Sequence, residues 1–431
     1  MKTTLILLII LLLSFPSKLL AQSNNFADNF NTIQYSLSRG DAAESYRLVY
    51  SLCENYPDSS KAWFLKSQVE RQIIQYKKAL ESVKQAIALE PGIPAYYYQI
   101  SSLYSDLQQH DLCISYCDSV ISIDSTHLFA SILKAQALSK DGKIQEALNQ
   151  YYTLHLRDSL NINFMKQIGS LHSKIDSLND AIKWYTMAVE VDSTDIPAYT
   201  HLGNLYVRTE QYEEGLPVLS RAILIDTLNS WLYRFRGSLN IMGANLKDAE
   251  YDFKQAILLG DSTAFTFRHL GLSLYKQSKY AEAFPIYQIT IKLDPEDSQA
   301  WYYLAFCYKW REDLEKAIAC MENSLKLSVT PGISDVYSGL AQLHSLVRDY
   351  ESAMHFYSRA YEWNEEDAVP LAQMGMLIEQ TGGNKKEAKA YYKSFLEKAG
   401  LKDVNLRDYV ENRIRLINEK LFMEGKLQKD N

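Results

Sequence analysis

Residues 264–295, AFTFRHLGLSLYKQSKYAEAFPIYQITIKLDP, consist of two amphipathic halves separated by a polar break at residues 277–279. The apolar and small residues of the first half recur at i, i+3, i+4 and i+7, the spacing of one helix face: Phe267, Leu270, Gly271 and Leu274. Ala283, Tyr287 and Thr290 form the matching face of the second half. The stretch therefore predicts a helix, a turn and a second helix.

The same unit recurs at a constant interval along most of the chain. With residue 264 counted as position 1, repeats begin at residues 26, 60, 94, 128, 162, 196, 230, 264 and 298. Two more begin at residues 334 and 368, displaced by small insertions. Each repeat is named below by its first residue. This regularity predicts an array of helical hairpins rather than two or three separate globular domains.

Residue size follows the same register. Position 20 is small throughout: Ala79, Cys113, Ala147, Ala181, Gly215, Ala249, Ala283, Ala317 and Ala353. Position 8 is small as well: Ser67, Ser101, Ala135, Gly169, Gly203, Gly237, Gly271, Ala305, Ala341 and Gly375. Aromatic residues recur at position 24, as Tyr151, Tyr185, Phe253, Tyr287 and Tyr357, and at position 4, as Trp63, Tyr97, Tyr199, Tyr233, Phe267, Trp301 and Tyr337. Large residues facing small ones let paired helices approach closely.

In its period and in these residue sizes, the unit resembles the tetratricopeptide repeat (TPR) family over about residues 26–398. The resemblance implies an all-α fold, a right-handed α-solenoid of stacked helix-turn-helix hairpins. The proline that closes the family's repeat is present only as Pro57, Pro91 and Pro295. Asp-Ser-Thr replaces it at residues 124–126, 192–194 and 261–263, where we expect these residues to cap the following helix.

The first residues have the layout of a secretory signal peptide. Lys2 precedes an apolar run from residue 5 to residue 13, and the small residue Ala21 marks a cleavage site. We therefore expect residues 1–21 to be removed and the protein to be exported, as a periplasmic, outer-membrane-associated or secreted protein. An uncleaved membrane anchor is the alternative, but Pro16 and Lys18 interrupt the run before the roughly 20 apolar residues that a spanning helix needs.

The remaining chain divides into three parts. Residues 22–59 form a degenerate repeat or N-terminal cap, and residues 60–398 form the TPR solenoid of about ten repeats. Residues 399–431 form a capping helix and a tail. An apolar stripe along residues 403–420 and just beyond predicts this helix: Val410, Ile414, Ile417 and Leu421. A helix with one apolar face gives the end of a solenoid the polar outer surface that it needs.

Composition and motifs restrict the function. Loss of Lys2 and Lys18 changes the formal net charge from −7 to −9, which disfavours binding to nucleic acid or to an anionic membrane. The five cysteines are too few for a disulfide framework, and we expect Cys113 and Cys117 to be buried as small apolar residues. The chain has no phosphate-binding loop, nucleophile elbow, HExxH or paired CxxC motif. We therefore expect no enzymatic activity, cofactor or metal.

The resemblance assigns partner binding to the concave wall, which in this family is lined by positions 2, 5, 9, 12 and 13 of each first helix. In repeats 162 to 298 the candidate residues are Lys166, Lys174, Asn204, Arg208, Arg234, Arg268, Tyr275, Lys276, Tyr302, Phe306, Lys309 and Trp310. Two interpretations of this basic, aromatic set remain open. The cations bind an extended acidic partner, or they pair with neighbouring Asp and Glu side chains.

The sequence thus predicts a non-enzymatic protein-interaction scaffold, exported to the cell envelope, that holds an extended protein or peptide in its groove. The alternative is a glycan-binding adaptor in polysaccharide or cell-wall assembly or export, because aromatic side chains can stack on sugar rings. An acidic peptide held by Lys and Arg would dissociate steeply with rising salt, whereas neutral sugar stacking would barely respond.

Overall fold

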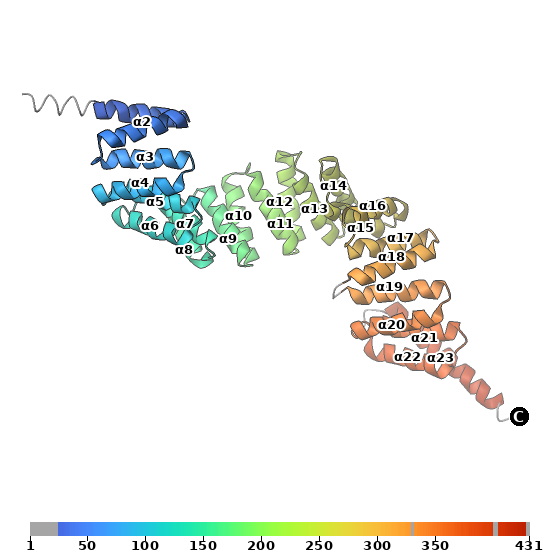
Figure 1. Ribbon diagram of the computed structural model, residues 1–431. Coiled ribbons are helices and arrows are strands. Elements are labelled where there is room, and N and C mark those ends of the chain that lie inside the picture. The colour runs from blue at the N-terminus through green and yellow to red at the C-terminus, as the bar shows by residue number, and fades with distance from the viewer. Residues whose placement is uncertain (1–24, 329–331, 400–403, 428–431) are drawn as a thin grey trace, which may run out of the picture. The chain divides into compact units, whose positions relative to one another are not determined.

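The computed structural model describes residues 25–328, 332–399 and 404–427, and over these residues the protein is helical without a strand. Helices follow one another as antiparallel pairs, such as α3 with α4 and α17 with α18 (Figure 1). The chain forms two compact units, Met1–Ala198 and Tyr199–Asn431, called here the N-terminal and C-terminal units. The predicted signal peptide, residues 1–21, lies outside the described residues. The predicted all-α hairpin solenoid is confirmed.

The first helix of each hairpin begins at the predicted start of a repeat or one residue from it. These helices are α3 (Ser60–Gln72), α5 (Pro94–Asp106), α7 (Leu128–Lys140), α9 (Ile162–Lys174), α11 (Ile196–Arg208), α13 (Ser230–Met242), α15 (Ala264–Lys276), α17 (Ser298–Trp310), α19 (Ile333–Leu346) and α21 (Val369–Gln380). Residues 25–38 form a helix whose Ile33 packs in one core cluster with Val49 and Leu52 of α2 (Ala42–Asn55).

The second helices complete the hairpins. They are α4 (Tyr76–Leu89), α6 (His110–Ile123), α8 (Ile144–Arg157), α10 (Leu178–Val191), α12 (Tyr212–Ile225), α14 (Leu246–Leu258), α16 (Tyr280–Leu293), α18 (Leu314–Leu327), α20 (Tyr350–Trp363) and α22 (Lys385–Lys398). A longer helix, α23 (Val404–Leu427), packs on α22 and buries Val410 and Ile417. In the parts of the chain that the structure describes, no helix combines the length and the apolar character that crossing a bilayer requires.

Close contact between a small residue and a ring holds together the hairpins that have an aromatic residue at position 24. A Cβ atom added to Gly271 on α15 would lie 2.8 Å from two ring atoms of Tyr287 on α16. Gly169 meets the ring of Tyr185 in the same way at 2.9 Å. The rings of Tyr185 and Tyr287 are almost completely buried. In these hairpins position 8 is therefore small because position 24 places an aromatic ring against the backbone of the first helix.

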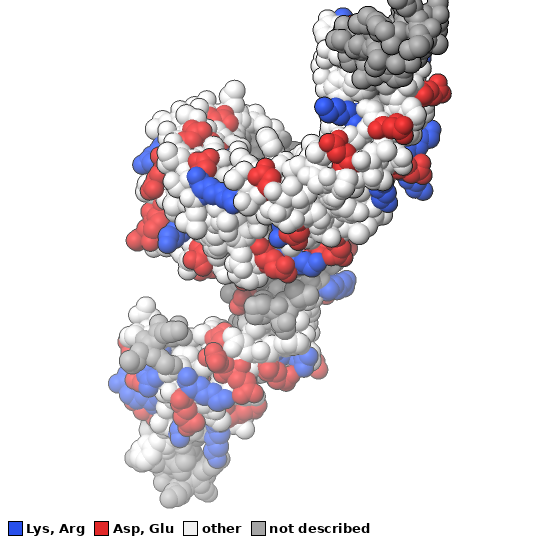
Figure 2. Space-filling model, turned by 90° about the vertical axis from the view of Figure 1, so that its left-hand side faces the viewer, with Lys and Arg blue, Asp and Glu red and all other residues white. Residues whose placement is uncertain are grey.

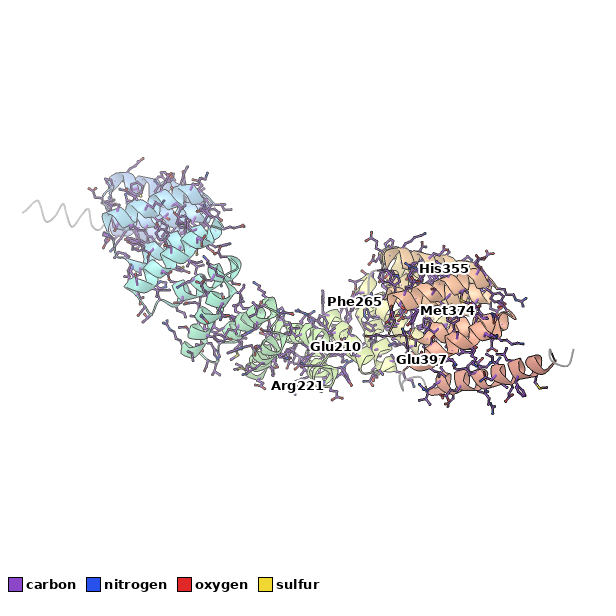
Figure 3. All side chains as sticks on the ribbon, turned by 90° about the horizontal axis from the view of Figure 1, so that it is seen from below. Glu210, Arg221, Phe265, His355, Met374 and Glu397 are labelled. Atoms are coloured by element: carbon purple, nitrogen blue, oxygen red, sulfur yellow. The ribbon has the colours of Figure 1, made fainter. Side chains whose placement is uncertain are left out.

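The turn inside each hairpin uses a backbone conformation that the sequence did not reveal. Position 15 has a positive φ in every repeat from 60 to 368, yet only Gly142 and Gly382 are glycines there. The others are Ile74, Gln108, Asp176, Glu210, Ala244, Ser278, Glu312 and Arg348, of which Glu210 is labelled in Figure 3. Backbone N–H groups of residues 278 and 279 donate to the carbonyls of Tyr275 and Leu274, which is the Schellman pattern.

Two different contacts secure the turns between repeats. The indole nitrogen of Trp63 donates to the carbonyl of Pro57 at 2.7 Å, and Trp301 donates to Pro295 at 2.9 Å. Where Asp-Ser-Thr replaces proline, the aspartate accepts hydrogen bonds from the backbone and hydroxyl of the threonine two residues later. Of these residues only Thr263 is itself an N-cap, whereas His127 caps α7. The expectation that each Asp-Ser-Thr would cap the next helix is therefore wrong for residues 124–126 and for residues 192–194, where Asp195 accepts from the backbone N–H of Ala198.

Candidate partner-binding face

The first helices of neighbouring repeats share one side of the array. In the N-terminal unit α3 contacts α5 and α5 contacts α7, and in the C-terminal unit α13 contacts α15 and α15 contacts α17. Side chains that point away from the second helices therefore lie next to each other from repeat to repeat. We call this side the first-helix face. The twelve residues that the sequence assigned to partner binding lie on first helices, Lys166 and Lys174 in the N-terminal unit and the other ten in the C-terminal unit.

The cations at position 5 have partners within the protein. Lys166 Nζ in the N-terminal unit lies 2.5 Å from Asp195 Oδ2. In the C-terminal unit Arg268 Nε lies 3.4 Å from Asp297 Oδ2, and an Arg268 guanidinium N–H also donates to Gln299. Asp195 and Asp297 each accept a further hydrogen bond from a backbone N–H in the first turn of the next first helix. A cation from one repeat thus lies on the carboxylate that caps the following repeat.

Arg234 adds aromatic contacts to a similar ion pair. Its Nη1 lies 3.5 Å from Asp261 Oδ2, and its guanidinium carbon lies 3.7 Å from the ring centroid of Trp231 and 5.5 Å from that of Phe265. Trp231 is 52% exposed and Phe265 is 37% exposed; Phe265 is labelled in Figure 3. The guanidinium therefore holds two exposed rings of neighbouring repeats in place.

An aromatic cluster follows on α15 and α17. The ring of Tyr302 lies edge-on to that of Phe306 at 4.9 Å, and the ring of Tyr275 lies 6.2 Å from Phe306. Burial raises the pKa of Tyr275 to about 12, so the phenol stays neutral and acts as a contact surface and hydrogen-bond donor. Trp310 is 51% exposed and packs on Tyr280 at 6.1 Å.

The other assigned residues are dispersed. Lys309 Nζ donates to Gln342 at 2.6 Å, and burial lowers the pKa of this lysine. Lys174, in the N-terminal unit, donates to Ser139 at 3.2 Å. Asn204, Arg208 and Lys276 lie exposed on α11 and α15. On the face shown in Figure 2, basic and acidic side chains of the described residues are interspersed.

A cavity of about 260 Å³ opens on the first-helix face of the C-terminal unit, between α17, α19 and α21. Tyr302 and Phe306 line one side of it, and Asp335 and Asp367 also line it. The sequence analysis did not single out Asp367, Ser338 or Gln373 of this lining. For Asp367 the reason is that it lies at the end of its repeat rather than on a first helix. A signal was present, since Asp195 and Asp297 occupy the same position 34.

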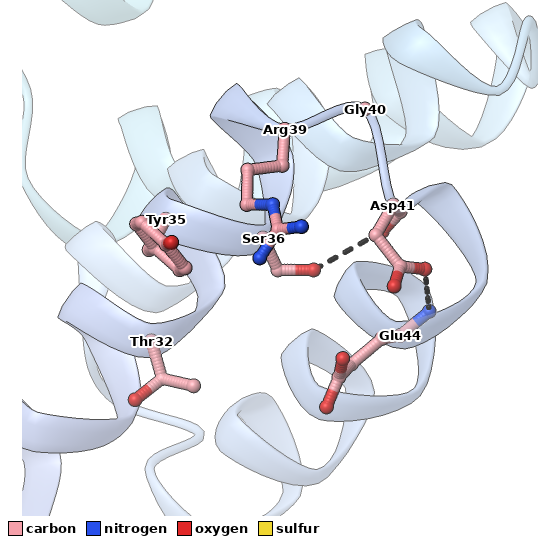
Figure 4. A pocket seen from close by; sticks show the side chains of 7 residues that line it. All are labelled: Thr32, Tyr35, Ser36, Arg39, Gly40, Asp41 and Glu44. Atoms are coloured by element: carbon pink, nitrogen blue, oxygen red, sulfur yellow. Dashed lines mark hydrogen bonds between the residues drawn. The ribbon is translucent and has the colours of Figure 1, made fainter.

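A second cavity, of about 360 Å³, lies in the N-terminal unit at the turn before α2 (Figure 4). Asp41 caps α2 by accepting from the backbone N–H of Glu44 at 3.1 Å, and Ser36 donates to the carbonyl of Asp41. Asp41 and Ser36 of this lining thus complete the hairpin turn. Capping accounts for the arrangement, so we do not place the binding site here.

In the described ranges, the histidine and cysteine side chains, which bind metals or act as nucleophiles in other proteins, are dispersed or buried. No set of three or more His, Cys, Asp or Glu residues within the described ranges is arranged to hold a metal ion. Cys53, Cys113, Cys117, Cys307 and Cys320 are buried free thiols. His172 bonds the hydroxyl of Tyr152, and His344 bonds Asp349. These histidines fasten helices to one another.

Comparisons with known proteins agree with the repeat architecture. Family models described as tetratricopeptide repeat match residues 296–366 and 269–308, and the model of the Psidin N-terminal TPR repeats region matches residues 99–216. Among curated relatives, BBSome complex member BBS4 from Bos taurus is 25% identical over 130 residues, which is 30% of this chain and 24% of that protein. Hsp70-Hsp90 organizing protein from Triticum aestivum is 24% identical over 132 residues, 31% of this chain and 22% of that protein. The match thus spans about a quarter of the length of these relatives.

Two solved structures are also similar. The first is YrrB, described as a TPR protein with an unusual peptide-binding site, at 21% identity and a TM-score of 0.38, covering 43% of this chain and 95% of that one. The second is yeast Tom70, at 13% identity and a TM-score of 0.40, covering 95% of this chain and 99% of that one. The repeat register, the paired helices and the family models together establish that this chain is a tetratricopeptide repeat protein.

Proposed function

We propose that this protein is a non-catalytic interaction scaffold that holds an extended partner polypeptide against α13, α15 and α17. TPR proteins commonly act as protein-interaction scaffolds. The observation that carries the proposal is the pair of exposed rings, Trp231 and Phe265, held by the guanidinium of Arg234. Large aromatic side chains beside a fixed arginine are the groups that most often dominate binding energy at protein interfaces.

Acidic residues in the partner fit this part of the face. Arg234 and Arg268 each use only part of their five N–H donors on their aspartate partners, so N–H groups remain for a second carboxylate or a carbonyl oxygen. Lys276 extends from the same helix as Arg268 and is exposed. The aromatic rings then supply contact area, and the cations favour partner segments that carry Asp or Glu.

We further propose that the protein is exported to the cell envelope, in the periplasm or at the outer membrane. The N-terminal apolar run and Ala21 support this proposal. N-terminal sequencing of the protein purified from an envelope fraction tests it. A terminus at Gln22 is expected, whereas a protein that retains Met1 and remains in the cytosolic fraction would rule export out.

A random octapeptide library displayed on phage tests the binding site. The full chain should select peptides that contain acidic residues, and Trp231→Ala should weaken their binding by about tenfold or more. Tyr251→Ala is the matched control, because Tyr251 on α14 is equally exposed, at 55%, but lies on a second helix. If both variants bind the selected peptides as tightly as the parent, the first-helix face around Trp231 is not the site.

A glycan ligand is the competing candidate, favoured by the exposed indole rings of Trp231 and Trp310. Salt separates the two ligand classes. Binding of an acidic peptide should weaken strongly as ionic strength rises, whereas binding of a neutral oligosaccharide should change little. An oligosaccharide that binds tightly, in a manner sensitive to Trp231→Ala and insensitive to salt, would replace the peptide proposal.

A further inference from the structure

Ion pairing along the first-helix face follows a positional rule. In the described repeats, the aspartates at position 34 are Asp195, Asp297 and Asp367. Position 5 of the same repeat supplies a cation to the first two, Lys166 to Asp195 and Arg268 to Asp297. In repeat 334, position 5 is Ser338. Asp367 therefore occupies the paired position without the cation that accompanies its counterparts.

The surroundings of Asp367 remain negative. Its Oδ1 accepts from the backbone N–H of Val369 at 3.0 Å, and a second carboxylate, that of Asp335 in the first turn of α19, lines the same cavity. Among residues 25–328, 332–399 and 404–427, no lysine or arginine lies within ion-pair distance of either carboxylate, and none lines the cavity. Lys309 donates to Gln342 of the lining but does not itself line the cavity.

The cavity also offers ring surfaces. Tyr302 and Phe306 form its α17 side, and the buried ring of Tyr357 lines it as well. Burial together with the carboxylate of Asp335 raises the pKa of Tyr302, so the phenol is neutral beside the acidic group. A volume of about 260 Å³ is below that of pockets for drug-sized ligands but accommodates one long side chain. Carboxylates beside ring surfaces are complementary to a cation on a flexible or planar side chain.

We propose that this cavity binds the side chain of an arginine or lysine in the extended partner, which takes the place of the missing position-5 cation. Asp367 and Asp335 receive its N–H donors, and Tyr302 and Phe306 pack on its apolar stem. Arginine is favoured, because its planar guanidinium both stacks on rings and bonds carboxylates. The inference rests on the proposed function and adds to it, since the partner would carry a basic residue beyond its acidic segment.

Two small probes test the cavity directly, without the unknown partner. N-acetyl-arginine methylamide carries the cation, and N-acetyl-citrulline methylamide has nearly the same shape without the charge. Binding of each to the full chain is titrated by saturation-transfer NMR. The arginine probe should bind about tenfold more tightly than the citrulline probe, and Asp367→Asn should remove most of that difference.

A second variant uses the positional rule itself. Ser338→Arg supplies the missing position-5 cation, as in repeats 162 and 264, and should block the arginine probe while leaving the thermal melting curve intact. Ser358→Arg on α20 is the matched control: it adds the same cation outside the cavity lining and should leave binding unchanged. Equal affinity for the two probes, or an arginine affinity unaffected by both Asp367→Asn and Ser338→Arg, overturns the inference.

The same variants keep this inference separate from the proposed function. Trp231→Ala should leave binding of the arginine probe unchanged, because Trp231 does not line the cavity. Suppose that the phage library selects peptides whose binding depends on Trp231, and that Ser338→Arg weakens none of them as much as removal of one of their basic residues does. The scaffold proposal then stands and the cavity inference fails. If the arginine probe binds as expected and binding of no selected peptide depends on Trp231, the cavity inference stands and the scaffold proposal fails.

Discussion

Replacing Gly271 by alanine should destabilise the C-terminal unit by about 1–2 kcal/mol, although alanine is the better helix former. The new Cβ would lie 2.8 Å from Cε1 and Cζ of Tyr287 and 3.2 Å from Cδ1. The ring has no room to retreat, because it is fully buried and stacks on Tyr303 at 5.6 Å. Overpacking of this kind costs about 1–3 kcal/mol, and the gain in helix propensity offsets about 0.5–1 kcal/mol of it.

Urea unfolding should be combined with amide hydrogen exchange, because a repeat array need not unfold as one cooperative unit. The loss of protection in Gly271→Ala should be largest in α15 and α16 and small in α3 and α4. Gly332→Ala is the control, because a Cβ there meets nothing within 4 Å. An unchanged urea midpoint with unchanged protection of α15 would refute the packing argument.

A compensating change sharpens the test. In repeat 298 the same two positions are occupied by Ala305 and Met321, both fully buried. The double variant Gly271→Ala with Tyr287→Met reproduces that pair. It should be more stable than the sum of the two single changes predicts, because the flexible thioether can move away from the new methyl group.

Three further predictions concern stability. Tyr287→Ala should lower the free energy of unfolding of the C-terminal unit by about 3–5 kcal/mol in a urea titration, because it empties a fully buried site; an unchanged midpoint would show that the repeat register is wrong. Ile74→Gly should raise stability by about 0.5–1 kcal/mol, because Ile74 is β-branched, 72% exposed and held at φ 63°; a lower melting temperature would contradict this. Burial lowers the pKa of His269 to about 4, so the unfolded chain binds the extra proton first, and stability should fall by about 3 kcal/mol as the pH drops from about 6.5 to 4. His269→Gln should lose that component, which urea midpoints at about pH 5 and pH 8 would reveal; parallel pH profiles of parent and variant would exclude it.

The sequence predicted the parts of the fold that depend on residue size at a fixed spacing. Gly271 and Tyr287 occupy positions 8 and 24 of one hairpin, so their contact follows from the period alone. The turn conformation was not predictable in this way. Ile74 and Ala244 adopt a positive φ because the Schellman hydrogen bonds and the packed helices on either side fix the backbone, and neither residue type indicates it.

The candidate site was predictable only in part. Sequence spacing identified Arg234, Arg268, Tyr302 and Phe306 as first-helix residues, but not the carboxylates that meet the arginines. Asp297 lies at the far end of the repeat that contains Arg268, and the two come into contact only because the next repeat stacks on the previous one. Asp367 could not be assigned to the cavity for the same reason, because it also lies at the end of its repeat.

The chemical reactivity of the five buried thiols reports partial unfolding of the protein. Cys53, Cys113 and Cys117 lie in the N-terminal unit, and Cys307 and Cys320 lie in the C-terminal unit. Burial raises the pKa of Cys307 to about 12, so this thiol reacts with an alkylating reagent only when its hairpin opens. Mass spectrometry after brief alkylation would therefore record, without any introduced label, which of the two units opens first and whether a bound partner delays it.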